Sequence, residues 1–403
     1  MSFMIRDPRG CSNIGGALAA NMEKCRSSLM HLFSLYGYHP FSPAEFQLIE
    51  DVWDKISPSR ARRLIPVMSP LGEACVLRGD LTLSAMAYLA VHHTQSEWPL
   101  RLSYADRVFS VPAPPKGNLE ESQVGVELIG CKEEGADTEA AVLLLRALDL
   151  LGIENAVVVF GDVSFLSCLF ADLPAELSAR LADALIERCY TGYSALLDGA
   201  SLPEERRALL KRLPMLKGGA SVIDEAASLL DTPDVLKPLR RLCAELSSLG
   251  YEGRMLIDLS FVRDLGYYSG VIYNAYSGDG TLLGGGGRYD GLLSDGGIGA
   301  KSVGFGLNLK ELASQCAAPR QVPLVTLWCG GCRASEALRY ADALSRKNVQ
   351  FELSWCGDKE ESRESARRRG SLWWADLASK SAFMFACGRA ATLKEFEEEA
   401  LSC

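Results

Sequence analysis

Four short segments combine charged or amide side chains with glycine in patterns that could bind a small polar ligand. In Gln123-Val-Gly-Val-Glu127, alternate residues share a strand face, so Gln123, Gly125 and Glu127 point the same way. An amide and a carboxylate on either side of a glycine offer hydrogen bonds around an open space. That arrangement suits a ligand with cationic or N–H groups, although a solvent-facing polar edge would give the same pattern.

Two further segments carry charged side chains that have both a structural and a ligand-binding interpretation. Asp80 precedes an apolar helical pattern, so its carboxylate could cap that helix or hold a ligand ammonium group. Residues 261–270 combine Arg263 with the adjacent Tyr267 and Tyr268. On a strand, neighbouring side chains point to opposite faces, so only one of the two tyrosines is expected to enter any one site.

The fourth segment is a run of glycines, 284–287, followed by Arg-Tyr-Asp-Gly. Four glycines lose much backbone entropy on folding, so they indicate a place where the backbone approaches a ligand or another backbone closely. The run does not match the G-x-G-x-x-G pattern, and no Walker lysine follows it. A nucleotide site is therefore not predicted from the glycines.

The cysteine and histidine residues do not predict a redox or metal site. Cys329-Gly-Gly-Cys332 precedes a helical pattern and resembles a thioredoxin motif, but no proline follows Pro323, where that fold would need one. The four histidines show no H-E-x-x-H spacing, and no second C-x-x-C is present. No metal, cofactor or catalytic residue is expected.

Composition predicts a cytoplasmic, multidomain protein. The 403 residues exceed one ordinary core, and 48% hydrophobic with 23% charged residues is typical of soluble proteins. No apolar run is long enough to span a membrane, and the N-terminus does not resemble a signal peptide. A net charge of −9 disfavours general nucleic-acid binding. Thirteen cysteines fit a reducing compartment.

Periodicity places the four segments on an α+β framework. Apolar residues spaced by three or four predict a helix over 17–36, ended by Gly37, and another over 137–151 with Asp137 as its N-cap. Residues 174–249 are helix-rich. The remaining predictions are strands at 73–78, 100–109, 122–129, 156–160 and within 255–276, a helix at 80–92, and C-terminal strands near 324–328, 350–355 and 382–386.

Taken in order, the segments resemble the class II catalytic core of the histidyl-tRNA synthetases and of their paralogues, the regulatory subunits of ATP phosphoribosyltransferase. The resemblance covers roughly residues 10–315. The matching stretches are Tyr36-Gly-Tyr with Pro43 for motif 1, residues 100–130 for motif 2, VRDLGYYSG and GGRYDG for the two histidine-specific signatures, and VGFGLNL for motif 3.

The resemblance implies a fold, a domain order and a ligand pocket. The fold would be an α+β class II synthetase-like antiparallel sheet flanked by helices. The core would occupy 1–173 and 250–318, a helical insertion 174–249, and a small α/β domain 322–403. Carried over position by position, the histidine-binding residues are Asp80, Thr82, Gln123, Glu127, Arg263, Tyr267 and Tyr268. Asp80 stands where the synthetases have Glu, and R-D-L-G-Y-Y replaces their R-G-L-D-Y-Y.

The positions that bind ATP in the synthetases have changed. Ser110 stands in place of the motif 2 arginine, and Glu311 aligns with the motif 3 arginine, although a one-residue shift would place Lys310 there. Loss of two cations predicts loss of adenylate chemistry. The resemblance therefore favours a non-catalytic regulatory subunit that senses histidine for the first step of histidine biosynthesis.

The implied partner is a short-form ATP phosphoribosyltransferase catalytic subunit, with this chain as a homodimer inside a hetero-oligomer, by resemblance a hetero-octamer. Two alternatives stay open. One is a histidyl-tRNA synthetase with an atypical ATP site. The other is a histidine- or RNA-binding module without a phosphoribosyltransferase partner.

Overall fold

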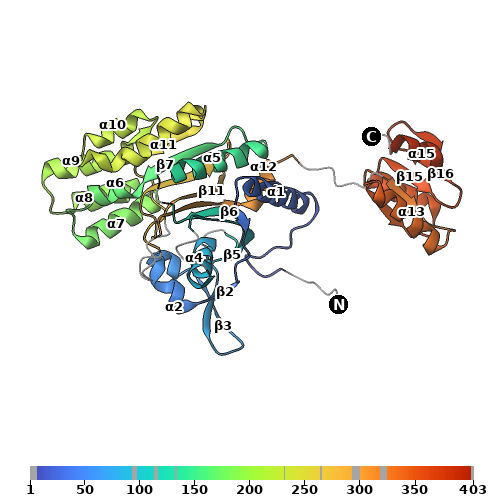
Figure 1. Ribbon diagram of the computed structural model, residues 1–403, viewed down its shortest axis with the longest axis horizontal. Coiled ribbons are helices and arrows are strands. Elements are labelled where there is room, and N and C mark those ends of the chain that lie inside the picture. The colour runs from blue at the N-terminus through green and yellow to red at the C-terminus, as the bar shows by residue number, and fades with distance from the viewer. Residues whose placement is uncertain are drawn as a thin grey trace. The chain divides into compact units, whose positions relative to one another are not determined.

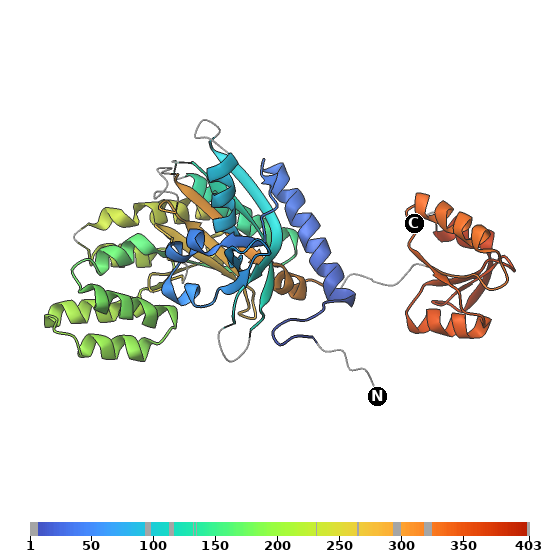
Figure 2. The ribbon, with the colours of Figure 1, turned by 90° about the horizontal axis from the view of Figure 1, so that it is seen from below.

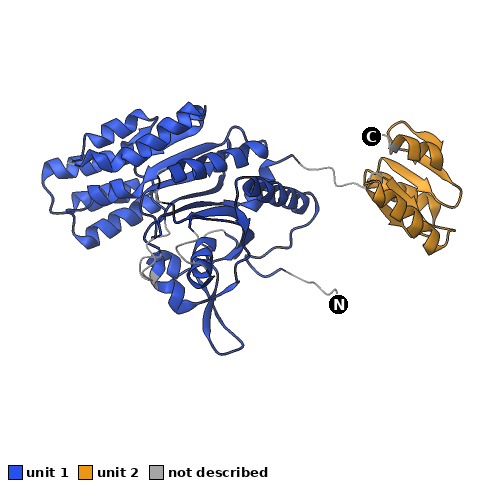
Figure 3. Cartoon of the chain, viewed as in Figure 1, with its two compact units in different colours: residues 1–318 blue, residues 319–403 orange. Residues whose placement is uncertain are grey.

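The computed structural model describes residues 7–92, 98–112, 117–131, 133, 135–230, 232–263, 266–292, 300–317 and 325–400. The chain forms two compact units, residues 1–318 and 319–403 (Figure 3). No helix within the described ranges has the length and apolar character that crossing a bilayer requires.

The first unit is built on a nine-stranded sheet of order β1-β5-β6-β12-β11-β10-β7-β9-β8 (Figure 1). Every neighbouring pair is antiparallel except β1–β5 and β7–β9. In sheet order the strands are His39–Pro40, Leu100–Phe109, Glu120–Ile129, Ser302–Asn308, Leu282–Arg288, Val271–Tyr276, Val157–Asp162, Met255–Asp258 and Lys217–Gly218. The predicted antiparallel sheet flanked by helices is confirmed.

One face of this sheet packs against helices. Along β6, Val124, Val126 and Leu128 are fully buried beneath this helical layer, which follows from their alternation with the polar residues of the strand. Helix α1 contacts α12, β5 and α5, and it ends where Gly37 adopts a φ of 79°. The helices are α1 (Gly16–Leu35), α5 (Gly135–Leu150) and α12 (Leu309–Gln315).

A group of helices joins β7 to β9 and lies beside that end of the sheet (Figures 1 and 2). Helix α6 packs against β10, and α11 packs against α5. The chain segment predicted as helix-rich therefore extends the helical layer. Its helices are α7 (Ala175–Ile186), α8 (Tyr190–Asp198), α9 (Glu204–Arg212), α10 (Ser221–Ala227) and α11 (Lys237–Ser248), and α6 (Val163–Leu169) precedes it.

Smaller elements near the N-terminus complete the first unit. A three-stranded sheet has the order β2-β4-β3. In the chain, the short helix α3 precedes β3, and helix α4 follows β4. Asp80 Oδ1 accepts a hydrogen bond from Leu83 N at 2.9 Å and so caps α4. The bounds are β2 (Phe46–Leu48), α2 (Ile49–Val52), α3 (Pro58–Ala61), β3 (Ile65–Met68), β4 (Ala74–Leu77) and α4 (Leu81–His92).

The prediction that Asp137 caps a helix is wrong. Helix α5 already begins at Gly135, which puts Asp137 in its first turn. The carboxylate instead accepts hydrogen bonds from Arg288 of β11, from Nε at 2.9 Å and from Nη2 at 2.7 Å. Only 8% of the Asp137 side chain and 12% of the Arg288 side chain are exposed. This buried ion pair, which joins residues 151 positions apart, ties the helical layer to the sheet.

Replacing Asp137 with alanine is expected to lower the free energy of unfolding by about 3 kcal/mol, because the buried Arg288 would keep only Asp290, 3.3 Å from its Nη1, as an ionic partner. Urea denaturation of the two proteins measures this loss. A double variant, Asp137→Leu with Arg288→Met, should be less destabilised than Asp137→Ala, since it leaves no buried charge. Equal losses in the two variants would show that packing, not charge, sets the cost.

The second unit contains a five-stranded sheet of order β14-β13-β15-β16-β17, in which β14, β13 and β15 are parallel. Cys329 follows β13, and burial together with the neighbouring Cys332 thiol raises its pKa to about 11. A reactive thiol has a lowered pKa, so this shift is in the opposite direction. The elements are β13 (Val325–Trp328), α13 (Ala334–Arg346), β14 (Phe351–Ser354), α14 (Lys359–Arg368), β15 (Trp373–Asp376), β16 (Ser381–Met384), β17 (Arg389–Thr392) and α15 (Leu393–Ala400).

Candidate functional site

Glu127 is the centre of a polar cluster on the sheet face opposite the helical layer. It lies on β6 opposite Gly304 of β12, and 1% of its surface is exposed. Oε1 accepts hydrogen bonds from Thr82 Oγ1 at 2.7 Å and from Tyr104 Oη at 3.2 Å, while Oε2 accepts one from Tyr289 Oη. Three hydroxyl groups therefore orient a single buried carboxyl group.

Burial raises the pKa of Glu127 to about 8. The hydroxyl groups of Tyr289, Thr82 and Tyr104 lower the pKa by donating to the carboxylate, and the charge of Asp80 raises it, but the loss of solvation is the largest effect. The carboxyl group thus changes its ionisation near neutral pH. A cationic ligand group placed against it would favour the ionised form.

A second cluster links Asp80 to the two tyrosines. Tyr267 Oη donates a hydrogen bond to Asp80 Oδ2 at 2.9 Å. The rings of Tyr267 and Tyr268 lie 4.9 Å apart, and Tyr267 also meets the Tyr289 ring edge-on at 5.8 Å. The prediction that only one tyrosine points into the site is wrong, because the strand begins at Val271 and residues 267–268 do not alternate as a strand would.

Arg263 closes this cluster on the side of β10. Its Cζ lies 5.3 Å from the centroid of the Tyr268 ring, as in a cation–π contact. Nη1 donates hydrogen bonds to Tyr273 O at 3.1 Å and to Asn274 Oδ1. Nε is buried and has no hydrogen-bond partner among the residues that the structure describes. A buried donor of this kind is costly unless an acceptor, such as a ligand carboxylate, reaches the guanidinium.

Gln123 lies on the same face of β6, four residues before Glu127 and opposite Asn308. Its Oε1 is 3.4 Å from the position that a Cβ at Gly306 would occupy. The structure therefore brings all seven residues predicted for the pocket to one face of the sheet. Six of them form the two connected clusters, and Gln123 stands toward the β5–β6 connection.

Glycines line the sheet beneath these side chains. A Cβ at Gly304 would lie 2.0 Å from Glu127 Oε2, and a Cβ at Gly285 would lie 2.3 Å from Arg263 Nη1. A Cβ atom cannot lie so close to another heavy atom, so glycine is required at these two positions. Gly304 thus leaves room for the buried carboxyl group, and Gly285 leaves room for the guanidinium.

Ser110 and Glu311, which the resemblance aligns with the two ATP-binding arginines of the synthetases, lie at the ends of different elements. Ser110 lies just after β5, where its N–H donates to Leu119 O at 2.9 Å, and Arg60 and Arg63 line the same small depression. Glu311 lies in the first turn of α12, where its N–H donates to Asn308 Oδ1 at 3.2 Å. Arg60 and Arg63, which lie outside the motif-like stretches, thus line the same depression as Ser110.

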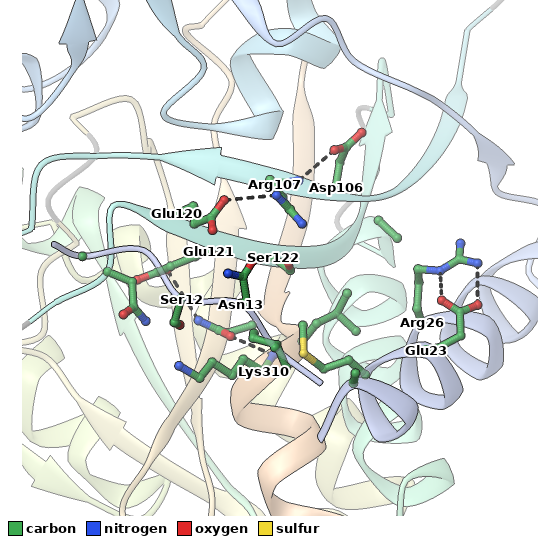
Figure 4. Close-up of a pocket in the computed structure, with 18 residues that line it drawn as sticks. Ser12, Asn13, Glu23, Arg26, Asp106, Arg107, Glu120, Glu121, Ser122 and Lys310 are labelled. Carbon is green, nitrogen blue, oxygen red and sulfur yellow. Dashed lines mark hydrogen bonds and ion pairs between the residues drawn. The ribbon is translucent and has the colours of Figure 1, made fainter. Parts of the chain in front are cut away.

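Lys310 lines a separate cavity of about 500 Å³ beside α1 and the ends of β5 and β6 (Figure 4). Its other charged groups mostly pair with one another. Arg26 and Glu23 lie 2.7 Å apart, and Arg107 and Glu120 lie 3.1 Å apart (Figure 4). This cavity contains none of the residues predicted for the pocket.

Comparison with known proteins assigns the class and then the family. The nine-stranded sheet and its polar face are those of class II synthetase-like proteins, and the family model described as histidyl-tRNA synthetase matches residues 10–312. A solved histidyl-tRNA synthetase from Nostoc sp. PCC 7120 shares the fold, with a TM-score of 0.81 at 15% identity over 100% of this chain and 99% of that one.

Closer similarity is found to a paralogous group. The ATP phosphoribosyltransferase regulatory subunit of Shouchella clausii is 30% identical over 87% of this chain and 91% of its own length, and that of Bacillus subtilis is 29% identical over 77% and 81%. A Bacillus halodurans structure titled as ATP phosphoribosyltransferase regulatory subunit/histidyl-tRNA synthetase has a TM-score of 0.81 at 26% identity, covering 93% and 98%. The chain belongs to the family of ATP phosphoribosyltransferase regulatory subunits.

Several residues of the site were not predicted from the sequence. Tyr104 and Tyr289 orient Glu127, and Asn274 holds Arg263. The Arg-Tyr-Asp-Gly sequence drew attention to Tyr289, but only the pairing of β11 with β12 brings it to Glu127. Tyr104 alternates with Ala105 like any strand residue, and no local signal marks it.

Proposed function

We propose that this chain is a non-catalytic regulatory subunit of an ATP phosphoribosyltransferase and that its pocket binds free histidine. One asymmetry carries the proposal. The buried Glu127, the partly buried Asp80 and Arg263 lie in connected polar clusters on one face of the sheet. By the resemblance, Ser110 and Glu311 stand where a synthetase would hold ATP with arginines. The amino-acid side of the site persists, and the phosphate side of the adenylate reaction does not.

The pocket offers a partner for each polar group of histidine. Glu127 would accept the imidazole N–H, and Asp80, with Thr82 and Gln123 nearby, would receive the α-ammonium group. Arg263 would bind the ligand carboxylate, for which its guanidinium is suited. Tyr267 and Tyr268 would flank the ligand with their rings.

The regulatory part of the proposal requires a catalytic partner. A short-form catalytic subunit would carry out the transfer, and this chain, as a cytoplasmic homodimer in a hetero-oligomer, would communicate the histidine level to it. Such coupling requires histidine to bind two states of the complex with different affinity.

Reconstitution tests this proposal. The full chain is co-expressed with a short-form catalytic subunit, and phosphoribosyl transfer to ATP is followed with and without histidine. We expect the two chains to co-purify, transfer to depend on this chain, and histidine to inhibit it. A folded chain that does not assemble, or a complex that releases no heat on titration with histidine and is not inhibited by it, would overturn the proposal.

The same preparation tests the rival activity. Histidine-dependent exchange of pyrophosphate into ATP is the first half-reaction of a synthetase. We expect none above background, because the two ATP arginines are absent. Exchange at a rate that depends on histidine would show that the chain is a synthetase.

A further inference from the structure

A cavity next to the proposed histidine site, with Arg263 common to both, is lined by an excess of positive charge. It has a volume of about 700 Å³ and lies over β10, β7 and β9, between α3 and the helices that join β7 to β9. Among the described residues that line it, the charged ones are Arg60, Arg63, Arg188, Lys217, Arg263 and Asp258. Five cations thus face one anion in a chain whose net charge is −9.

Two of the cations, Arg188 and Lys217, come from the helical segment, and each contacts a tyrosine side chain. Arg188 Nη2 donates to Tyr276 Oη at 2.8 Å, with its Cζ 6.0 Å from the ring centroid. Lys217 Nζ donates to Tyr190 Oη at 2.7 Å and pairs with Asp258 at 3.1 Å. Both cations are therefore positioned at the cavity by aromatic partners from other elements.

The backbone of Arg188 ends helix α7. Its φ is 55°, a left-handed conformation just after the end of α7, where glycine would fit without strain. A non-glycine residue there costs on the order of 1 kcal/mol. The N–H groups of Arg188 and Cys189 donate to Leu185 O and Ala184 O, so this conformation ends the helix and places Arg188 beside the cavity.

The opposite wall supplies two more guanidinium groups. Arg60 belongs to α3 and Arg63 follows it, with Arg63 Nε donating to Val111 O at 2.9 Å. Both also flank Ser110, which stands where the synthetases have a phosphate-binding arginine. Arg263 lies between the two walls and contacts the Tyr268 ring of the amino-acid pocket.

We propose that this cavity binds a small polyphosphorylated anion, held between Arg188 and Lys217 on one wall and Arg60 and Arg63 on the other. Guanidinium and ammonium groups on facing walls match an anion with two phosphate groups better than one with a single group. The volume suits a metabolite-sized ligand. The inference adds a second ligand to the proposed function and does not depend on histidine binding.

Calorimetric titration of the full chain with inorganic pyrophosphate tests the proposal. We expect saturable binding that weakens at higher salt, and affinity for orthophosphate that is about tenfold lower because fewer charge-assisted hydrogen bonds form. Arg188→Gln and Lys217→Gln should each raise the Kd for pyrophosphate about tenfold. Arg180→Gln, which changes an exposed arginine of helix α7 that does not line the cavity, should leave it unchanged.

Thermal melting confirms that each variant is folded, and a histidine titration keeps the two proposals apart. Arg188 and Lys217 lie outside the amino-acid pocket, so histidine binding should be the same in both variants and in the parent. Loss of histidine binding with intact pyrophosphate binding would count against the proposed function alone. No pyrophosphate binding, equal affinity for orthophosphate, or an unchanged Kd in Arg188→Gln and Lys217→Gln would overturn the polyanion site.

Discussion

Replacing Gly304 with alanine is expected to abolish histidine binding and to lower the free energy of unfolding by about 1–3 kcal/mol or more. The added Cβ would meet Glu127 Oε2 at 2.0 Å and Val126 O at 2.4 Å. The backbone of β6 has no room to retreat, because it is paired on both sides. The carboxyl group of Glu127 would therefore have to leave its three hydroxyl partners.

Gly306, two residues further along the same strand, provides a matched control. A Cβ there would lie 3.4 Å from Gln123 Oε1 and 3.4 Å from Tyr104 Oη, which is close to ordinary contact. Gly306→Ala should keep the stability of the parent within about 0.5 kcal/mol. Urea denaturation and histidine titration of the two variants check this contrast. Equal unfolding free energies and histidine affinities in the two variants would show that the Glu127 carboxyl group does not require a glycine at position 304.

The sequence was sufficient to predict the elements that carry the pocket. Alternation along residues 122–129 predicted a strand with Glu127 on the face opposite the valines, and the structure confirms both the strand and its helix-covered face. The stripe of residues 17–36 predicted α1 to within one residue at each end. Such patterns are local consequences of burial, so they can be read without knowledge of the partner elements.

Contacts between distant segments could not be predicted in the same way. Asp137 has the sequence position of a helix cap, but its partner Arg288 is 151 residues away. The hydroxyl donors to Glu127 come from three different elements of the chain. Strand β15, Trp373–Asp376, was not predicted, and all four of its residues are buried within a mixed sheet where alternation gives no signal.

The positively charged cavity could not be predicted from the sequence either. Arg60 lies 128 residues before Arg188, and Lys217 lies 29 residues after Arg188. Only the return of the helical segment to the sheet at β8 and β9 brings them to one cavity. The net charge of −9 disfavours general nucleic-acid binding, but it describes the average surface and not this cavity.

Replacing Glu127 with glutamine is expected to weaken histidine binding by about 1.5–3 kcal/mol, the contribution of a hydrogen bond to a charged group. Glutamine keeps the size of the side chain and its ability to accept from the hydroxyl groups of Thr82 and Tyr104. The variant should therefore fold. Calorimetric titration measures the loss, and Glu121→Gln, an exposed carboxylate on the same strand, serves as the control.

The same substitution should remove a pH dependence. Because burial raises the pKa of Glu127 to about 8, the native state keeps a proton that the unfolded chain releases near pH 4.5. The contribution of Glu127 to the free energy of unfolding is therefore fully present below pH 4.5. It decreases as the pH rises toward 8, by roughly 5 kcal/mol in all. Glu127→Gln should show a flatter profile of unfolding free energy over this range.

Histidine binding should release the proton that Glu127 keeps in the ligand-free native state. An imidazole N–H or a cationic group placed against Glu127 favours the carboxylate, so binding at pH 7 should release a proton to the buffer. Titrations in two buffers of different ionisation enthalpy measure that release, which Glu127→Gln should lack. A parent protein that binds histidine without releasing a proton, or a variant that keeps the pH slope, would assign the titration to another group and place the imidazole away from Glu127.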